Sequence, residues 1–422
     1  MLAWEPGVGK TYPLLAAASK GKGKTLYLGP PAIRTQVARE AVAYGFFTQD
    51  EIQVIGSGRD KLWPDARLII SSYEHAVNPS IWKQLFKEEW DALVLDEAHM
   101  LKNQTAKRTK AVYGARSNSA GALYKQAKRI WLATGTPLVN DPSDLWTHVS
   151  RCFPEIAESL NISNKYDWMD KFCFTVDTPY GPKVLGGRNL ELLKVALKNK
   201  VSRIKKTEAL DLPPLNITQQ WVPPTKIDMS NIPLEALDEL MVLLNSTDEE
   251  DFDRLATPLA TLRRKIGLAK AAHVAEIART EFYGSESKII IFYQHTGVME
   301  EIKASLEQSV GMANTVLTYS GGLSTAKRDA IVKSFNEDPK CRILLAQIQA
   351  AGTGLNLQCA NRVLLAEPAW TPALNDQAIS RAYRGGQTQK VWASYICLEK
   401  SVDEAVTKAL IRKSKIIEGA IG

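Results

Sequence analysis

The sequence predicts an α/β fold in which two parallel-sheet lobes have helical insertions between them. Three observations support this prediction. The chain of 422 residues is too long for one ordinary core. Short unbroken apolar runs alternate with helical patterns, which is typical of parallel strands covered on both faces. The alternation occurs twice, once early and once late, so two sheets with right-handed β-α-β connections are expected.

Apolar runs predict the strands of both sheets. The early runs are residues 25–28, 68–70, 92–95 and 130–133. The late runs are residues 288–292, 315–317, 342–345 and 362–365. Helical patterns separate them, as at residues 324–335.

These patterns divide the chain into three segments. Residues 1–210 form the first lobe, with a helical and aromatic-rich insertion at about 141–200 that shows no clear strand. Residues 211–280 hold a connection with two Pro-Pro pairs, and helices are expected from 234 to 281. Residues 281–422 form the second lobe.

Composition excludes several classes of protein. No run of roughly 18 apolar residues predicts a membrane span, and Met1 leads straight into a glycine-rich loop rather than a signal peptide. The five cysteines show neither a CxxC pair nor metal-ligand spacing. We therefore expect free thiols in a reducing compartment.

Positive charge is concentrated in one stretch, although the net charge of +7 is modest. Between Leu101 and Ile130 there are eight basic residues and no acidic one. Such a stretch can neutralise the phosphates of nucleic acid, or it can be an ordinary solvated surface. Composition leaves both interpretations open.

A glycine-rich loop near the start predicts a phosphate site. The loop consists of Gly7, Val8, Gly9, Lys10 and Thr11. Its glycines allow backbone N–H groups to turn toward phosphate oxygens, and the N-terminus of the predicted helix after it favours negative charge. Lys10 would reach the β- and γ-phosphates, and Thr11 would bind Mg²⁺. The full pattern has glycine where this chain has Trp4.

Two carboxylates follow the predicted strand at residues 92–95. Asp96 and Glu97 would lie at the carboxyl edge of a parallel sheet, beside the phosphate loop. Asp96 would hold Mg²⁺, and Glu97 would polarise the attacking water in phosphoryl transfer.

A third group of polar side chains lies far along the chain. Gln377, Arg381 and Arg384 are spaced i, i+4 and i+7, which predicts one face of a helix. Two arginines presented by a second lobe would act as arginine fingers on phosphate oxygens. The alternative is an arginine-rich surface helix.

Eight motifs follow one another in a fixed order. They occupy residues 2–11, 28–31, 71–74, 96–99, 133–140, 291–293, 351–357 and 384–387, with Lys102-Asn103 after the fourth and Trp370-Thr371-Pro372 after the seventh. In this order they resemble motifs I, Ia, Ib, II, III, IV, V and VI of the Swi2/Snf2 family of superfamily 2 helicase-like DNA translocases, over nearly the full chain. Residues 186–192, 203–207 and 212–214 are similar to the HARP-like annealing-helicase subgroup.

The resemblance implies two RecA-like lobes and a DNA-dependent ATPase that uses ATP and Mg²⁺. Gly352 and Gly354 would join the phosphate loop in nucleotide binding, while His99, Thr134 and Thr136 would couple the nucleotide state to lobe movement. The implied DNA contacts are Arg34, Ser72, Tyr73, Lys102, Asn103, Gln294, Asn356 and Trp370. For Trp370 a buried core position is the alternative.

The resemblance also implies duplex or branched DNA as the partner, with little sequence preference. We expect a monomer without membrane association, cytoplasmic or nucleoid-associated, in a bacterial or phage-infected cell. A strand-separating helicase and a nucleotide-gated DNA-binding protein with little turnover remain open. The family's adenine-reading segment is expected to lie upstream of this chain, so adenine recognition follows from the resemblance alone.

Overall fold

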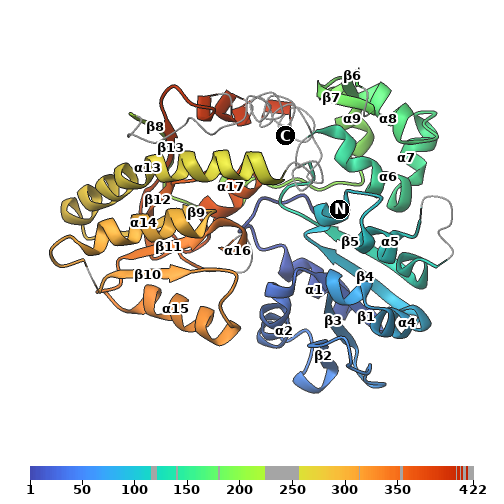
Figure 1. The fold of residues 1–422 in the computed structure, drawn as a ribbon. Helices are drawn as coiled ribbons and strands as arrows, with labels where there is room; N and C mark the ends of the chain where they lie inside the picture. Colours follow the sequence, from blue (N-terminus) through green and yellow to red (C-terminus); the bar gives the residue numbers. More distant parts are fainter. Residues whose placement is uncertain are drawn as a thin grey trace. The chain divides into compact units, whose positions relative to one another are not determined.

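The computed structural model shows two compact units, each with its own parallel β-sheet (Figure 1). It describes residues 1–115, 121–138, 141–178, 181–223, 256–312, 314–351, 355–404, 406–408, 410–411 and 415–416. Over these residues the first unit comprises Met1–Phe174 and Gly187–Ala209, and the second comprises Thr175–Gly186 and Leu210–Ile416. No helix within the described ranges is long and apolar enough to cross a membrane.

A five-stranded sheet forms the centre of the first unit, in the order β2-β3-β1-β4-β5. The strands are β1 (Thr25–Gly29), β2 (Ile52–Val54), β3 (Leu68–Ser72), β4 (Trp90–Asp96) and β5 (Ala127–Ala133). All pairings between them are parallel, so their carboxyl ends share one edge. Asp96 and Ala133 are in register at this edge. The sequence predicted four of these strands, and β2 is too short to give an apolar run.

Helices cover both faces of this sheet. They are α1 (Thr11–Ser19), α2 (Arg34–Ala43), α3 (Tyr73–Val77), α4 (Pro79–Lys87) and α5 (Lys107–Tyr113), with short 3-10 turns η1 (Pro31–Ile33), η2 (Gln49–Glu51), η3 (Ala98–Leu101) and η4 (Leu123–Gln126). Because successive strand residues point to opposite faces, α1 and α2 share one core with Tyr27 and Val94. The other three helices share a second core with Leu26 and Leu93.

The insertion after β5 is mostly helical, as predicted, but it contains a β-hairpin. Its helices are η5 (Pro142–Leu145), α6 (Trp146–Cys152), α7 (Pro154–Ser159), α8 (Lys165–Phe172) and α9 (Leu190–Leu197), followed by α10 (Lys206–Ala209). Strands β6 (Cys173–Thr178) and β7 (Gly181–Gly187) pair with each other. The expectation of no strand between 141 and 200 is therefore wrong. The hairpin exposes Phe174, Val176 and Leu185, so it lacks the buried apolar runs that reveal core strands.

A six-stranded sheet forms the centre of the second unit, in the order β10-β11-β9-β12-β13-β8. The strands are β8 (Leu215–Val222), β9 (Lys288–Tyr293), β10 (Val316–Tyr319), β11 (Ile343–Gln347), β12 (Ala360–Leu365) and β13 (Val391–Leu398). Every pairing is parallel. Two parallel sheets in one chain confirm the predicted fold class.

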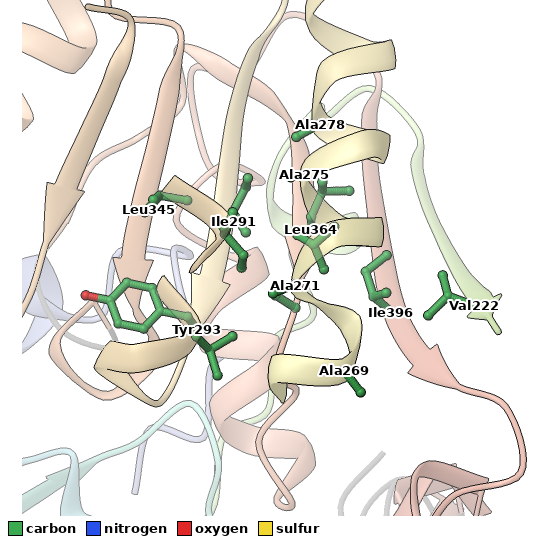
Figure 2. Close-up of a cluster of buried hydrophobic side chains, with 14 of the residues drawn as sticks. Val222, Ala269, Ala271, Ala275, Ala278, Ile291, Tyr293, Leu345, Leu364 and Ile396 are labelled. Carbon is green, nitrogen blue, oxygen red and sulfur yellow. The ribbon is translucent and has the colours of Figure 1, made fainter. Parts of the chain in front are cut away.

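Helices also cover both faces of the second sheet. They are α13 (Ala256–Gly284), α14 (Thr296–Glu307), α15 (Thr325–Glu337), α16 (Ile348–Ala351) and α17 (Pro372–Ile379). On one face, Ala271 and Ala275 of α13 belong to a buried cluster with Ile291, Leu364 and Ile396 of three neighbouring strands (Figure 2). The small alanine side chains let the helix approach the sheet closely. Helices α15, α16 and α17 contribute to the core on the opposite face.

The segment predicted as a proline-rich connection contains the edge strand β8. It pairs with β13, and the carbonyl of Pro214 accepts the N–H of Val391 at 3.1 Å. Proline cannot donate to a ladder and is confined to edges or ends of strands, so flanking Pro-Pro pairs suggested a connection and concealed the strand. Of the predicted helical stretch, residues 256–281 belong to α13, and residues 234–255 lie outside the described part.

Candidate functional site

The phosphate loop joins a short extended segment to α1 at the carboxyl edge of the first sheet. Leu2 forms parallel bridges to Ala133 of β5 and to Ser202. Gly7 and Gly9 have positive φ angles of 92° and 93°, which residues with a Cβ rarely adopt. These two glycines therefore allow the chain to turn into α1, which begins at Thr11.

Polar contacts hold Trp4 and Glu5, the residues that precede the glycines of the loop, in place. Lys10 Nζ donates to the carbonyl of Trp4 at 3.0 Å, and the N–H of Val8 donates to the carbonyl of Glu5 at 3.2 Å. The indole of Trp4 donates to Ser202 Oγ at 3.0 Å. Trp4 thus anchors the loop to a neighbouring segment, which gives a structural role to the residue that departs from the expected pattern.

Arg203 connects this loop to the segment after β5. One guanidinium nitrogen, Nη1, donates to the carbonyl of Ala3 at 2.8 Å and to that of Gly135 at 3.4 Å. Its Nη2 lies 3.4 Å from the carboxylate of Glu5. A Cβ on Gly135 would come within 2.7 Å of the Pro6 ring, so the two segments approach closely. The sequence did not identify Arg203 as a site residue, because a basic run gives no sign of which member contacts the phosphate loop.

Asp96 ends β4 in a buried position beside the loop. Its Oδ2 accepts a hydrogen bond from the Tyr27 hydroxyl at 2.6 Å, and its Oδ1 accepts the N–H of Glu97 at 2.9 Å. Burial, with the nearby Glu97 carboxylate, raises the pKa of Asp96 to about 6, while Tyr27 and Lys10 oppose this shift. Sequence reasoning missed Tyr27, since a tyrosine within a strand resembles any core aromatic.

Glu97 begins a polar chain that leads to the segment after β5. Its backbone is left-handed, with φ 50° and ψ 48°, a conformation that costs a residue with a Cβ about 1 kcal/mol or more. The His99 ring lies 3.3 Å from the Glu97 carboxylate. The same ring nitrogen, Nδ1, lies 2.9 Å from the Thr134 hydroxyl and 3.4 Å from that of Thr136. The structure therefore brings these four predicted residues into one network.

The oxygen atoms at this edge suit a magnesium ion. Thr11 and Asp96 offer hydroxyl and carboxylate oxygens, which are the ligands that Mg²⁺ prefers. Across the described ranges, no group of three His, Cys, Asp or Glu side chains could hold a metal alone. Mg²⁺ in phosphate sites needs only one or two carboxylates besides the phosphates. A cation would also offset the effects of burial and of the nearby Glu97 carboxylate, which together raise the pKa of Asp96.

In the second unit, the predicted arginine face is not a continuous helix. Helix α17 ends at Ile379 and contains Gln377, which is buried. Beyond it the backbone forms tight turns, in which the N–H of Arg381 donates to Ala378 O at 3.1 Å. The prediction that Gln377, Arg381 and Arg384 share one helix face is therefore wrong.

Local contacts explain where α17 stops. The Ser380 hydroxyl donates to the Asp376 carbonyl at 2.5 Å, which competes with continuation of the helix. Gly386 then takes a φ of 91°. Gln387 Nε2 stabilises the turns by donating to the backbone carbonyls of Gln358, Ala360 and Ala382.

Both arginines lie against the last residues of the seventh motif. Arg384 Nη1 donates to Leu355 O at 3.1 Å, and Arg381 O accepts the N–H of Leu357 at 3.0 Å. Gly352 and Gly354, predicted to bind nucleotide, lie outside the described residues.

In the first unit, two of the predicted DNA contacts are buried and need correction. Tyr73 is fully buried, and its hydroxyl donates to the backbone carbonyl of Asp96 at 2.8 Å. Ser72 is also buried and caps α3 by accepting the N–H of His75 at 3.2 Å. Their side chains therefore support β3, α3 and the end of β4 instead of facing a phosphate backbone.

The other predicted contacts of the first unit are partly exposed. Arg34 is half-buried and contacts the Ile55 carbonyl and the His75 ring. Lys102 Nζ lies 3.8 Å from the Asp144 carboxylate. The Asn103 side chain accepts the N–H of Thr105 at 2.8 Å, which fixes the turn after η3. Their contact with DNA stays a prediction.

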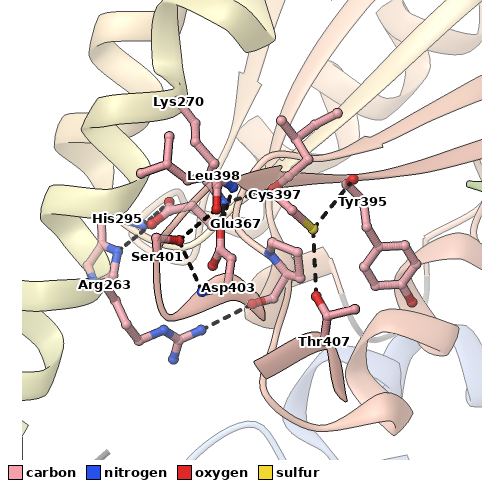
Figure 3. Close-up of polar contacts among 12 residues, drawn as sticks. Arg263, Lys270, His295, Glu367, Tyr395, Cys397, Leu398, Ser401, Asp403 and Thr407 are labelled. Carbon is pink, nitrogen blue, oxygen red and sulfur yellow. Dashed lines mark hydrogen bonds and ion pairs between the residues drawn. The ribbon is translucent and has the colours of Figure 1, made fainter. Parts of the chain in front are cut away.

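In the second unit, polar contacts involve Arg263, His295 and Glu367 (Figure 3), and Gln294 and Trp370 contact members of this group. Glu367 accepts the N–H groups of Gln294 and His295 at 2.8 and 2.9 Å, and contacts the His295 ring at 2.6 Å. The guanidinium of Arg263 lies 4.2 Å from the Trp370 ring centre. Trp370 is only 8% exposed, which agrees with the alternative of a core tryptophan. Asn356, in contrast, is exposed.

Two family models and several known proteins match this chain. The SNF2-related domain matches residues 1–264, and the Helicase conserved C-terminal domain matches residues 270–386. The mouse (Mus musculus) protein named DNA annealing helicase and endonuclease ZRANB3 is 25% identical over 99% of this chain and 38% of its own length. The Drosophila melanogaster protein named SWI/SNF-related matrix-associated actin-dependent regulator of chromatin subfamily A-like protein 1 is also 25% identical, over 99% of this chain and 53% of its own.

The chain thus spans about two fifths to one half of these relatives. Among solved structures, the Sulfolobus solfataricus SWI2/SNF2 ATPase core in complex with dsDNA aligns with a TM-score of 0.41 and 22% identity, covering 99% of this chain and 88% of that one. The SNF2-related match extends over more than half of the sequence and includes the phosphate loop, Asp96, Glu97 and Thr134. On this match, the chain belongs to the SNF2-related family.

Proposed function

We propose that this chain is an ATP-driven motor that moves along double-stranded DNA and remodels or anneals branched DNA in replication, recombination or repair. The observation that carries the proposal is the site at the carboxyl edge of the first sheet. There the glycine loop with Lys10 and Thr11 lies beside the buried carboxylate of Asp96, to which the Lys10 charge is coupled. The names of the relatives support annealing of DNA as the outcome.

Each residue of the first unit has a role in this proposal. Lys10 neutralises charge on the β- and γ-phosphates of ATP, and Thr11 and Asp96 hold Mg²⁺. A bound Mg²⁺ would supply positive charge that offsets the charge of the phosphates. Glu97 orients the attacking water, and its contact with the His99 ring passes the nucleotide state to Thr134 and Thr136.

The second unit supplies the positive charge that phosphoryl transfer requires as the bond to the γ-phosphate breaks. Arg381 and Arg384 fill this role, because arginine keeps its charge and presents several N–H donors to phosphate oxygens. Gln377 is proposed to assist them. Activity would therefore require both units, and neither half would hydrolyse ATP alone.

DNA is proposed to be held through its phosphate backbone, with little sequence preference. The side chains that remain candidates are Arg34, Lys102, Asn103, Gln294 and Asn356. Because the first four also make contacts within the protein, binding would change those contacts. The chain is proposed to act as a monomer.

The test is steady-state ATP hydrolysis by the purified chain without DNA and with single-stranded, duplex or forked DNA. We expect duplex and forked DNA to raise the rate. Lys10→Ala should abolish turnover, and Glu97→Gln should abolish turnover while ATP and DNA still bind. A rate that does not rise with duplex or forked DNA contradicts the proposal.

A second pair of assays separates the possible products of the motor. Annealing of complementary strands and displacement of a labelled strand are measured on the same fork. Annealing without displacement supports the proposal, while efficient displacement would indicate a strand-separating helicase. Equal DNA affinity and negligible hydrolysis in wild type and Glu97→Gln would instead indicate a nucleotide-gated binding protein.

A further inference from the structure

Three aromatic rings, two of them exposed and one partly buried, form a cluster next to the phosphate loop. Tyr12 directly follows Thr11 in the first turn of α1. Tyr44 follows the last residue of α2, and Phe46 lies two residues further. The ring centres of Tyr12 and Tyr44 are 5.1 Å apart, as are those of Tyr12 and Phe46, and Tyr44 and Phe46 are 6.0 Å apart. All three pairs are edge-to-face, so the rings form one continuous aromatic surface.

This surface is open to solvent although its residues are apolar. Tyr12 is 53% exposed and Tyr44 is 44% exposed, and the adjacent Val42 is 38% exposed. Single exposed apolar residues are ordinary, but a contiguous patch on a soluble protein marks a place where something binds. The cluster is therefore a candidate contact surface.

The backbone at the end of α2 and the core of the first unit both hold the rings in place, because Phe46 packs against that core. Gly45 has a φ of 71°, and its N–H donates to Val42 O at 2.9 Å while the N–H of Phe46 donates to Ala41 O at 3.1 Å. This helix end turns Tyr44 and Phe46 toward Tyr12. The next residue, Phe47, is buried and Phe46 is partly buried against the same core, so Tyr12 and Tyr44 are the exposed rings of the cluster.

The position of Tyr12 relative to the loop indicates the occupant. Lys10 is suited to the β- and γ-phosphates and Thr11 to the metal, while N–H groups of the loop and first helical turn hold the α- and β-phosphates. The nucleoside continues from the α-phosphate, close to the first side chain after Thr11. That side chain is the exposed ring of Tyr12.

We infer that Tyr12, supported by Tyr44 and Phe46, forms the stacking surface for the purine ring of the nucleotide, and this inference rests on the proposed function. Stacking on an aromatic ring is insensitive to base identity because every base has a flat π face. The surface therefore contributes affinity for ATP and GTP alike, and discrimination between them is not its role.

The test compares binding of ATP with binding of inorganic tripolyphosphate, which carries the phosphates but no base. Calorimetric titrations are made with wild type, Tyr12→Ala and Tyr12→Phe in the presence of Mg²⁺. We expect Tyr12→Ala to weaken ATP binding about tenfold, within the range known for loss of one aromatic–base stack. Tripolyphosphate should bind all three proteins equally, and Tyr12→Phe should bind ATP like wild type.

Tyr166→Ala is the matched control, because Tyr166 is 57% exposed on α8 and lies outside the cluster. It should bind both ligands like wild type. In steady-state hydrolysis, Tyr12→Ala should raise KM for ATP with little change in kcat, since a stack on the base is equal in the ground and transition states.

Several results would overturn the inference. If wild type binds and hydrolyses ATP but Tyr12→Ala has unchanged ATP affinity, the inference is overturned and the proposed function is not. An equal loss of ATP and tripolyphosphate affinity also overturns it, because the loop and not the base contact would then be damaged. Failure of wild type to bind ATP overturns the proposed function, and the inference with it.

Discussion

Replacing Tyr27 by phenylalanine removes one buried hydroxyl and tests how Asp96 is held. Tyr27 is fully buried in β1, and its hydroxyl donates to Asp96 Oδ2 at 2.6 Å. A hydrogen bond to a charged group contributes about 1.5–3 kcal/mol, and the carboxylate would keep only the Glu97 N–H as a donor. We expect Tyr27→Phe to lower the free energy of unfolding by about 2 kcal/mol, or the melting temperature by about 6 °C for a unit of this size.

The same change should weaken metal binding. Groups that orient a metal ligand typically change metal affinity or activity about 10- to 100-fold when they are removed. The assay is ATP hydrolysis as a function of Mg²⁺ concentration, and we expect Tyr27→Phe to require more than about tenfold more Mg²⁺. Saturating Mg²⁺ should restore most of kcat, because Glu97 and Lys10 are untouched.

Tyr73→Phe is the matched control for this experiment. Tyr73 is equally buried and also bonds to Asp96, but to its backbone carbonyl at 2.8 Å. The loss of a neutral hydrogen bond should cost about 1 kcal/mol and leave the Mg²⁺ requirement unchanged. If both variants shift the Mg²⁺ requirement equally, or neither does, the view that Tyr27 orients the Asp96 carboxylate is refuted.

Three further predictions concern other parts of the chain. Burial lowers the pKa of His148 to about 4, below its usual value of 6.5, so the unfolded chain takes up this proton at a higher pH and stability falls as the pH drops from about 6.5 toward 4. Because of His148, the free energy of unfolding should fall by about 2 kcal/mol between pH 7 and pH 5. In melting experiments at these two pH values, His148→Gln should remove this part of the pH dependence of stability. Lys270 is 2% exposed and donates to Asp403 Oδ2 and Ile396 O, both at 2.8 Å (Figure 3). In urea unfolding, Lys270→Met should therefore lower the free energy of unfolding by about 3 kcal/mol. The double change Lys270→Met with Asp403→Asn should lower it by less than the sum of the two single changes. Arg384→Ala should lower kcat more than ATP affinity, and a loss of affinity alone in single-turnover kinetics would contradict its proposed role.

The sequence predicted core strands well and edge elements poorly, for a physical reason. Strands such as β4 and β9 are buried on both faces, and this requires unbroken apolar runs that composition reveals. Strand β8 has one neighbour and prolines beside it, and the β6–β7 hairpin leaves Val176 exposed. Their stability comes from pairing partners that a local pattern does not contain.

Within the candidate site, sequence spacing located the residues but not their surroundings. The loop, Asp96 and Thr134 lie at one sheet edge, as the motif order implied. The helical spacing of Arg381 and Arg384 was misleading, because α17 ends at Ile379, before both of them. Tyr27 and Arg203 were missed because their roles depend on distant contacts, with partners 69 and 200 residues away for their shortest bonds.

The segment that leads into the phosphate loop forms hydrogen bonds with residues 202–204, and this has a consequence for synthesis of the protein. The N–H groups of Ala3 and Glu5 donate to the carbonyls of Ser202 and Ile204 at 2.8 and 3.0 Å. At about 5–20 residues per second, a ribosome makes this partner on the order of ten to forty seconds after the loop. Throughout that interval the loop lacks one of its two neighbours. The nucleotide-binding edge of the first unit is therefore among the last parts of that unit to become ordered during translation.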